Sequence, residues 1–177
     1  MNRPHSARKP RPPLDKASLQ ELALFYVGRF ATSRGKLVRY LDRKVRERGW
    51  EGGDEAGAAV HAVADRIAEL GYVDDAAYAA TRSRVLSARG LGPRRLSADL
   101  SAAGIGEADR NEAKAGFDAA AAAMRFAERK RLGPFGLSAP DPKLRDKQLG
   151  AMLRAGHSFD HARRIIDCEP GEMPDFS

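Results

Sequence analysis

Residues 89–96 read RGLGPRRL and interrupt a sequence that is otherwise rich in helix-forming residues. Gly90 can end one helix in the left-handed conformation, and Gly92 can cap the start of the next. Pro93 suits the first position of a helix, where its missing N–H costs nothing. The stretch therefore predicts a tight corner between two helices.

The same corner has features of an anion-binding site. The first amides of a helix have no partner within the helix, and Arg94 and Arg95 lie beside them. Arginines in a first turn oppose the helix dipole at a cost of about 0.3–1 kcal/mol each, which a partner's phosphate or carboxylate would offset. A nucleotide-binding loop has no signature here, because the chain contains neither a GxGxxG after a strand nor GxxxxGKS or GxxxxGKT. A plain corner and a contact site both remain open.

Three other corners resemble one another: residues 69–75 (ELGYVDD), 102–108 (AAGIGEA) and 154–160 (RAGHSFD). In each, a glycine ends one helix, and after a short spacer an acidic residue suits the positive end of the next helix. This repetition predicts three tandem helical units with weak internal similarity, which would form an elongated array.

Capping residues mark the starts of the predicted helices. Ser18 and Glu21 form a capping-box pattern, and Tyr26 and Phe30 then lie at helical spacing. Gly116 can divide the long alanine-rich helical span that contains it. The remaining helix starts are predicted at Ser33, Asp54, Asp74 or Asp75, Pro93, Glu107, Asp141 and Ser158.

These elements predict an all-α protein of tandem three-helix repeats, with about nine helices. Aromatic residues make up only 7% of the 177 residues and alanine is abundant, which suits closely packed helices better than strands. The predicted organisation is a disordered basic arm over residues 1–17, helical repeats over 18–71, 72–115 and 116–168, and an acidic tail over 169–177.

The chain carries a formal net charge of +7, which suggests an acidic partner. Eight basic residues lie between Arg29 and Arg48 against two acidic ones, and five arginines without any acidic residue lie between Ala76 and Ala98. One cluster of this kind is usually a solvated helix face, but two clusters make an electrostatic binding surface an equal alternative.

No catalytic or metal-binding constellation is recognisable. His157 and His161 have no carboxylate or cysteine at ligand spacing, and capping explains Asp74 and Asp75. The single cysteine, Cys168, excludes an internal disulfide and fits a reducing cytosol. No apolar run reaches the roughly 20 residues that cross a membrane. The sequence therefore predicts a cytoplasmic protein that is not an enzyme and uses neither cofactor nor metal.

Two motifs give the sequence a family resemblance. Residues 67–84 (IAELGYVDDAAYAATRSR), followed by 89–105 (RGLGPRRLSADLSAAGI), resemble the RecX family of bacterial regulators of the RecA recombinase. The resemblance extends to residues 33–41 and to 141–166 (DPKLRDKQLGAMLRAGHSFDHARRII). These motifs in this order are far more specific than any single glycine or arginine within them.

The resemblance implies a curved, all-helical molecule of tandem three-helix repeats and a function without catalysis. It implies docking along the RecA–DNA filament, inhibition of ATP hydrolysis and strand exchange, and altered filament growth or disassembly, in recombination, DNA repair and the SOS response. It also implies contact with DNA, which a basic surface would allow. These regulatory effects are expectations from the resemblance alone.

We expect basic side chains to contact RecA or DNA, mainly in the central repeat. The expected contact residues are Arg82, Arg84, Arg89, Arg94 and Arg95, with weaker contributions from Arg39, Arg43, Arg46, Lys143, Arg145 and Lys147. Their charges would set the association rate and its salt dependence. The expected partners are the RecA filament and its DNA, with no membrane, for a protein that is itself a monomer. A DNA-binding module or transcription regulator acting without RecA, and a scaffold for another acidic protein, are the alternatives.

Overall fold

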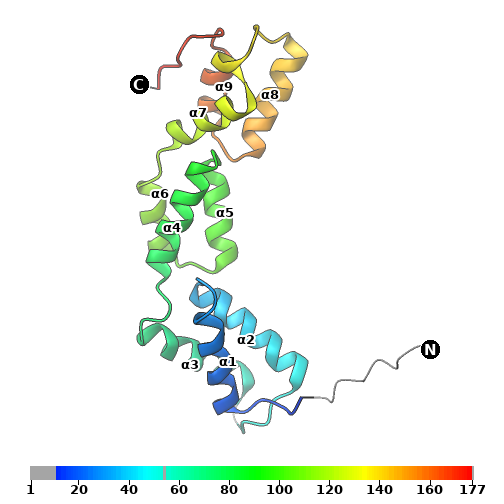
Figure 1. Cartoon of the computed structure of the whole chain (residues 1–177), viewed down its shortest axis with the longest axis vertical. Helices are drawn as coiled ribbons and strands as arrows, with labels where there is room; N and C mark the ends of the chain where they lie inside the picture. Colours follow the sequence, from blue (N-terminus) through cyan, green and yellow to red (C-terminus); the bar gives the residue numbers. More distant parts are fainter. Residues whose placement is uncertain (1–10, 54, 177) are drawn as a thin grey trace, which may run out of the picture. The chain divides into compact units, whose positions relative to one another are not determined.

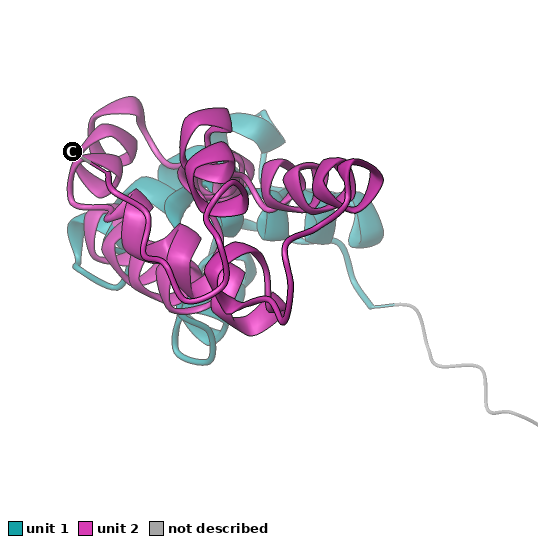
Figure 2. Ribbon diagram, turned by 90° about the horizontal axis from the view of Figure 1, so that it is seen from above, with its two compact units in different colours: residues 1–74 teal, residues 75–177 magenta. Residues whose placement is uncertain are grey.

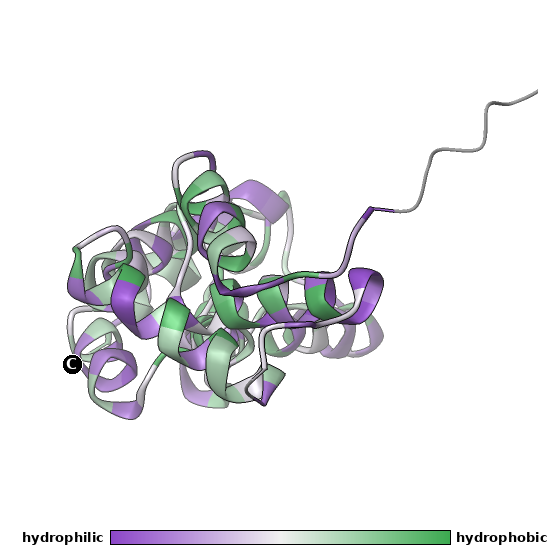
Figure 3. Cartoon of the chain, turned by 90° about the horizontal axis from the view of Figure 1, so that it is seen from below, coloured by the Kyte–Doolittle hydropathy of each residue, from purple (hydrophilic) through white to green (hydrophobic). Residues whose placement is uncertain are grey.

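The structure is a computed structural model that describes residues 11–53 and 55–176, and within these ranges every regular element is a helix. The all-α class predicted from the sequence is confirmed. The chain forms two compact units, Met1–Asp74 and Asp75–Ser177 (Figure 2). In Figure 3, hydrophilic and hydrophobic residues alternate along the helical ribbons, as expected of amphipathic helices that each bury one face.

Unit 1 consists of α1 (Lys16–Val27), α2 (Arg34–Arg48) and α3 (Ala56–Glu69), and each helix contacts the other two (Figure 1). Its core is aliphatic, with fully buried Leu37 and Ile67 among its members. Burial of each such side chain contributes about 1.5–3 kcal/mol relative to exposure, which holds the three short helices together.

The first helix starts earlier than its capping pattern suggests. Asp15 is the N-cap of α1: its carboxylate accepts a hydrogen bond from the Ser18 N–H at 2.8 Å, and the Ser18 hydroxyl accepts one from the Asp15 N–H at 3.0 Å. The bonds from Ser18 hold the pKa of Asp15 below its usual value. The predicted box of Ser18 and Glu21 is therefore wrong, because Ser18 closes a capping box that Asp15 opens.

The predicted disordered arm does not reach residue 17. Leu14 is fully buried in the core of unit 1. Its N–H donates to the Gly49 carbonyl and its own carbonyl accepts from the Glu51 N–H, both at 2.9 Å. Apolar burial and two backbone hydrogen bonds fix this segment before α1 begins. Residues 1–10 of the predicted arm lie outside the described residues.

Most of the other predicted helix starts are confirmed. Ser33, Asp141 and Ser158 cap α2, α8 and α9 by accepting the backbone N–H three residues further along. Asp54 lies outside the described residues, and Glu55 occupies the N-cap of α3 without a side-chain hydrogen bond.

Unit 2 contains two groups of three helices. They are α4 (Asp75–Ala88), α5 (Pro93–Ala103) and α6 (Glu107–Ala115), followed by α7 (Ala119–Lys130), α8 (Pro142–Arg154) and α9 (Phe159–Ile166), with a turn of 3-10 helix at Gly133–Phe135. Within each group every helix contacts the other two, and α4 also contacts α7. Gly116 separates α6 from α7, as predicted. Leu91 packs against the cores of both groups, so the second and third repeats form a single compact unit.

The three repeated corners share one backbone geometry. Gly71, Gly104 and Gly156 have φ values of 76°, 75° and 94°. After each glycine, the next N–H donates to the carbonyl five residues earlier, at 3.1–3.2 Å. This is the Schellman pattern, in which a glycine in the left-handed conformation lets the last carbonyls of a helix find donors. The repeated sequence thus encodes a repeated helix end, in agreement with a helical-repeat fold.

Candidate interaction surface

The corner over residues 89–96 packs on the corner over residues 154–160, backbone against backbone. A Cβ atom on Gly92 would overlap the carbonyl group of Gly156. A Cβ atom on Gly156 would in turn lie 2.6 Å from the backbone nitrogen of Arg95. Because side chains would prevent this approach, the two glycines allow the second and third helix groups to dock directly.

The amides at the start of α5 already have partners. The Gly92 N–H donates to the Ala155 carbonyl at 2.9 Å, and the Arg94 N–H donates to the Gly156 carbonyl at 3.2 Å. Pro93, between them, has no N–H to offer. An anion site built on free amides is therefore wrong, because carbonyl oxygens of the neighbouring corner occupy these donors. The residues form a corner, and any anion must be held by side chains.

The side chain of His157 joins the two corners from within the core. Its side chain is fully buried, its ring lies 5.5 Å from the Phe126 ring, and its Nε2 lies 3.1 Å from the Gly90 carbonyl oxygen. Since a carbonyl only accepts, Nε2 carries the proton, and the buried Nδ1 has no hydrogen-bond partner among the described residues. Burial lowers the pKa of His157, because it disfavours the charged ring. The residue is a packing element of the corner.

Three arginines surround this fixed backbone. Arg89, Arg94 and Arg95 are all exposed. The ion pairs found within residues 11–53 and 55–176 use other arginines. These three predicted contact residues are therefore exposed along one corner.

This corner lies in the part of the chain that matches a family model. Residues 74–113 match the model described as RecX, second three-helix domain. A regulatory protein RecX from Myxococcus xanthus (strain DK1622) is 33% identical over 164 residues, which cover 86% of each chain. This chain belongs to the RecX family of regulatory proteins.

Another RecX relative, from Mycobacterium sp. (strain JLS), is 32% identical over 164 residues, covering 89% of this chain and 86% of its own. A crystal structure of a regulatory protein RecX superimposes with a TM-score of 0.64 at 21% identity, covering 86% of this chain and 71% of that one. RecX from Lactobacillus salivarius gives a TM-score of 0.59 at 18% identity, covering 86% and 94%. At these identities the likeness to both structures concerns the fold, and it agrees with an all-α helical repeat.

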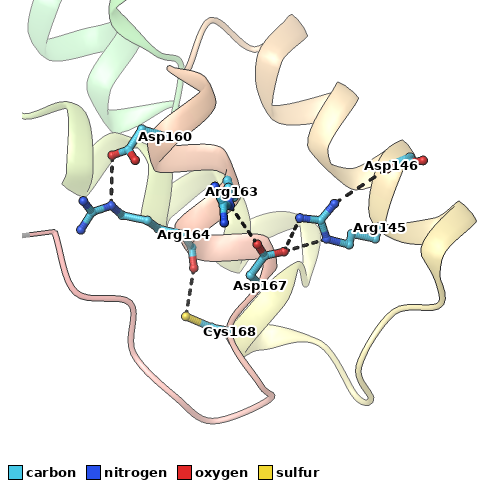
Figure 4. Close-up of polar contacts among 7 residues, drawn as sticks. All are labelled: Arg145, Asp146, Asp160, Arg163, Arg164, Asp167 and Cys168. Carbon is cyan, nitrogen blue, oxygen red and sulfur yellow. Dashed lines mark hydrogen bonds and ion pairs between the residues drawn. The ribbon is translucent and has the colours of Figure 1, made fainter.

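Two predicted contact residues of this RecX-family chain are engaged inside the fold. Arg82 of α4 donates to both carboxylate oxygens of Asp99 on α5, at 2.7 and 2.9 Å, and these bonds raise the pKa of Arg82. Arg145 of α8 binds Asp167, at the end of α9, through two nitrogens at 2.7 and 2.6 Å (Figure 4). Each arginine joins two helices of one group, so both brace the fold.

Arg84 lies near both a hydroxyl group and carboxylates. It donates to the Thr81 hydroxyl at 3.1 Å and lines a hollow of about 480 Å³ together with Asp109 and Glu112. These two carboxylates weaken the attraction of Arg84 for an anionic partner. Lys143 and Lys147, by contrast, are exposed on α8.

The remaining predicted residues belong to unit 1. Arg39, Arg43 and Arg46 are exposed on α2. Arg43 lies 3.6 Å from the carboxylate of Glu47, one turn further along the same helix. An exposed pair at this spacing contributes little stability, so the arginine can exchange it for another anion.

Several basic residues outside the predicted set also make contacts within the fold. Arg125 of α7 donates to the Ser87 hydroxyl at 3.0 Å and lines a second hollow, of about 380 Å³, with Arg84. Arg163 and Arg164 form ion pairs with Asp167 and Asp160 on or next to their own helix (Figure 4). The meeting of α7 with α4 is a contact between repeats, and no spacing within one helix could reveal it.

Within the described ranges, no three His, Cys, Asp or Glu residues are placed to hold a metal ion. None of the helices found there is long and apolar enough to cross a membrane.

Proposed function

We propose that this protein regulates RecA without catalysing a reaction, by binding the RecA–DNA filament through basic side chains at the docked corners. One observation carries the proposal: Arg94 and Arg95 are exposed on a backbone that is fixed by close packing of Gly92 on Gly156. Because this backbone is already fixed, binding would have to order only the two arginine side chains and not the chain that carries them. The relatives' own name, regulatory protein, agrees with this role.

The local electrostatics favour an external anion at this corner. Two arginines in the first turn of α5 oppose the helix dipole by about 0.3–1 kcal/mol each. The amides that would draw an anion to the backbone are occupied, so binding falls to the guanidinium groups themselves. A guanidinium group pairs with carboxylates and phosphates through two parallel hydrogen bonds. Carboxylates of RecA and phosphates of DNA are therefore the proposed partners of Arg94, Arg95 and Arg89.

Further basic residues would add long-range attraction. Lys143 and Lys147 on α8, and Arg39, Arg43 and Arg46 on α2, are proposed to raise the association rate more than to fix the bound geometry. Arg82 and Arg145 would support this function indirectly, by stabilising the helix groups that carry the contact residues. The protein would act as a monomer in the cytoplasm, on RecA–DNA filaments.

Binding along the filament would inhibit ATP hydrolysis and strand exchange. The test is the DNA-dependent ATPase rate of RecA with a stoichiometric amount of this protein. The rate should fall, and it should recover as salt is raised, because charge pairs between exposed groups are screened. An unchanged rate would refute the proposal. Binding of duplex DNA in a base-sequence-dependent manner without RecA would instead favour a transcription regulator.

A further inference from the structure

Unit 1 carries a stack of aromatic rings on its surface where α1 gives way to α2. The rings of Tyr26 and Tyr40 are stacked, with centroids 4.1 Å apart and planes 13° from parallel. The ring of Phe30 lies 5.3 Å from that of Tyr26, tilted by 46°. Phe30 is 51% exposed and lies beyond the last residue of α1, although the sequence places it at helical spacing with Tyr26. The stack therefore presents an apolar ring to solvent at a defined place.

The backbone holds Phe30 in position. Its N–H donates to the Tyr26 carbonyl at 3.0 Å, just beyond the end of α1. Thr32 and Ser33, which follow it, are buried, and Ser33 caps α2. With its chain fixed on both sides, the exposed ring is preorganised for a partner.

Cationic side chains lie beside the two tyrosines of the stack. A hollow of about 370 Å³ is lined by Tyr26, Lys36, Arg39, Tyr40 and Arg43. The guanidinium carbon of Arg43 lies 5.6 Å from the centre of the Tyr40 ring, within the range of a cation–π interaction. Helix α2 as a whole contains seven basic and two acidic residues, so the potential beside the hollow is strongly positive.

We infer that this surface of unit 1 binds single-stranded nucleic acid, with a base stacked on Phe30 and phosphates beside Lys36, Arg39 and Arg43. An exposed ring beside a cationic groove is what single strands require, because their bases have free faces and their backbone is anionic. A duplex offers the phosphates but keeps its base faces stacked on one another. The carboxylates of an acidic protein would pair with the basic side chains but would offer no planar group to stack on the Phe30 ring. The inference goes beyond the proposed function, since it needs no RecA.

The test compares two ligands that differ only in their bases. The affinity of the full-length protein is measured, without RecA, for a fluorescent oligothymidylate and for an abasic strand of the same length, and a duplex of that length is measured beside them. The wild-type protein should prefer the oligothymidylate. The Phe30→Ala variant should bind it roughly 5- to 150-fold more weakly, the factor expected for loss of one base–aromatic stack, and should bind the abasic strand as the wild type does.

Two control variants keep the result interpretable. Phe159→Ala removes a phenylalanine of similar exposure, 53%, from α9 in unit 2, and should leave both affinities unchanged. Arg39→Ala should weaken both ligands by a similar factor, because it removes a phosphate contact. Circular dichroism of each variant verifies that helical content is retained.

Three outcomes would overturn the inference. Phe30→Ala could weaken both ligands equally, which would make the ring a structural group only. The wild-type protein could bind duplex as tightly as the single strand. Phe30→Ala could also leave oligothymidylate binding intact, which would show that no base stacks on this ring. Because the binding assay contains no RecA, its failure leaves the proposed regulation of RecA standing, and failure of that regulation leaves this site standing.

Discussion

Gly92 occupies a position where any side chain would overlap the carbonyl group of Gly156. Its φ of −82° is open to every residue, so close approach and not backbone conformation requires the glycine. Gly156 combines both demands, with a φ of 94° and a close neighbour in Arg95. The sequence marks both glycines as helix ends, but it does not reveal that they touch.

Gly92→Ala should lower the free energy of unfolding by about 1–3 kcal/mol or more, because the added methyl group has no space without a shift of the docked corner. Gly106→Ala is the matched control: Gly106 is also a glycine N-cap, of α6, but a Cβ there meets nothing within 4 Å. Both variants lose the same N-cap preference, so the difference between them in urea denaturation reports the overlap. Equal losses would show that the corners are not in close contact.

His157 should make stability depend on pH. In the unfolded chain its pKa is near 6.5, and burial lowers the pKa in the folded protein. Between these two values the unfolded chain binds more protons. The contribution of His157 to the free energy of unfolding is therefore fully present above about pH 6.5. It is lost as the pH falls from there towards the folded pKa.

His157→Gln retains a donor for the Gly90 carbonyl but cannot titrate. Urea denaturation at several pH values from neutral to mildly acidic should show a shallower decline for this variant than for the wild type. If the two declines are the same, His157 is not the group that titrates, and its buried place beside Gly90 is in question.

The ion pair of Arg82 and Asp99 joins helices α4 and α5, and its side chains are 28% and 31% exposed. A double-mutant cycle with Arg82→Ala and Asp99→Ala should give a coupling energy of about 0.5–1 kcal/mol, since the geometry is bidentate but the pair is partly in water. The coupling should shrink in high salt.

The pair of Arg66 and Glu69, within α3, provides the comparison for that cycle. Its side chains are 61% and 65% exposed, and it joins residues of one helix. Its coupling energy should be smaller than that of Arg82 with Asp99. A coupling energy near zero would show that Asp99 does not hold Arg82, and Arg82 would then be available to contact RecA or DNA.

Local signals predicted the elements well because each is written within a few residues. The structure confirms Ser33, Asp141 and Ser158 as caps and Gly116 as a break between helices. The predicted start of α1 is wrong because two possible capping boxes overlap there, Asp15 with Ser18 and Ser18 with Glu21. Burial of Leu14 favours the earlier one. Partners such as Asp99 for Arg82, 17 residues apart, depend on how helices pack, and spacing along the chain carries no such information.

For the whole molecule, charge is the property that the sequence predicts most directly. A net charge of +7 should make binding to the RecA–DNA filament weaken steadily as salt concentration rises. Titrations of the filament at several salt concentrations would measure this dependence. Binding that is insensitive to salt would contradict a charge-based mechanism and would favour an apolar interface.

Inhibition of the DNA-dependent ATPase of RecA by the wild-type protein and by Arg94→Glu/Arg95→Glu is the most direct test of an interface at the corner. Arg129→Glu/Lys130→Glu is the control, because it makes the same change in net charge at two exposed residues at the end of α7. Circular dichroism should show equal helical content in all three proteins. A RecA interface at the corner predicts that the corner variant loses inhibition while the control retains it. Full inhibition by Arg94→Glu/Arg95→Glu would contradict it.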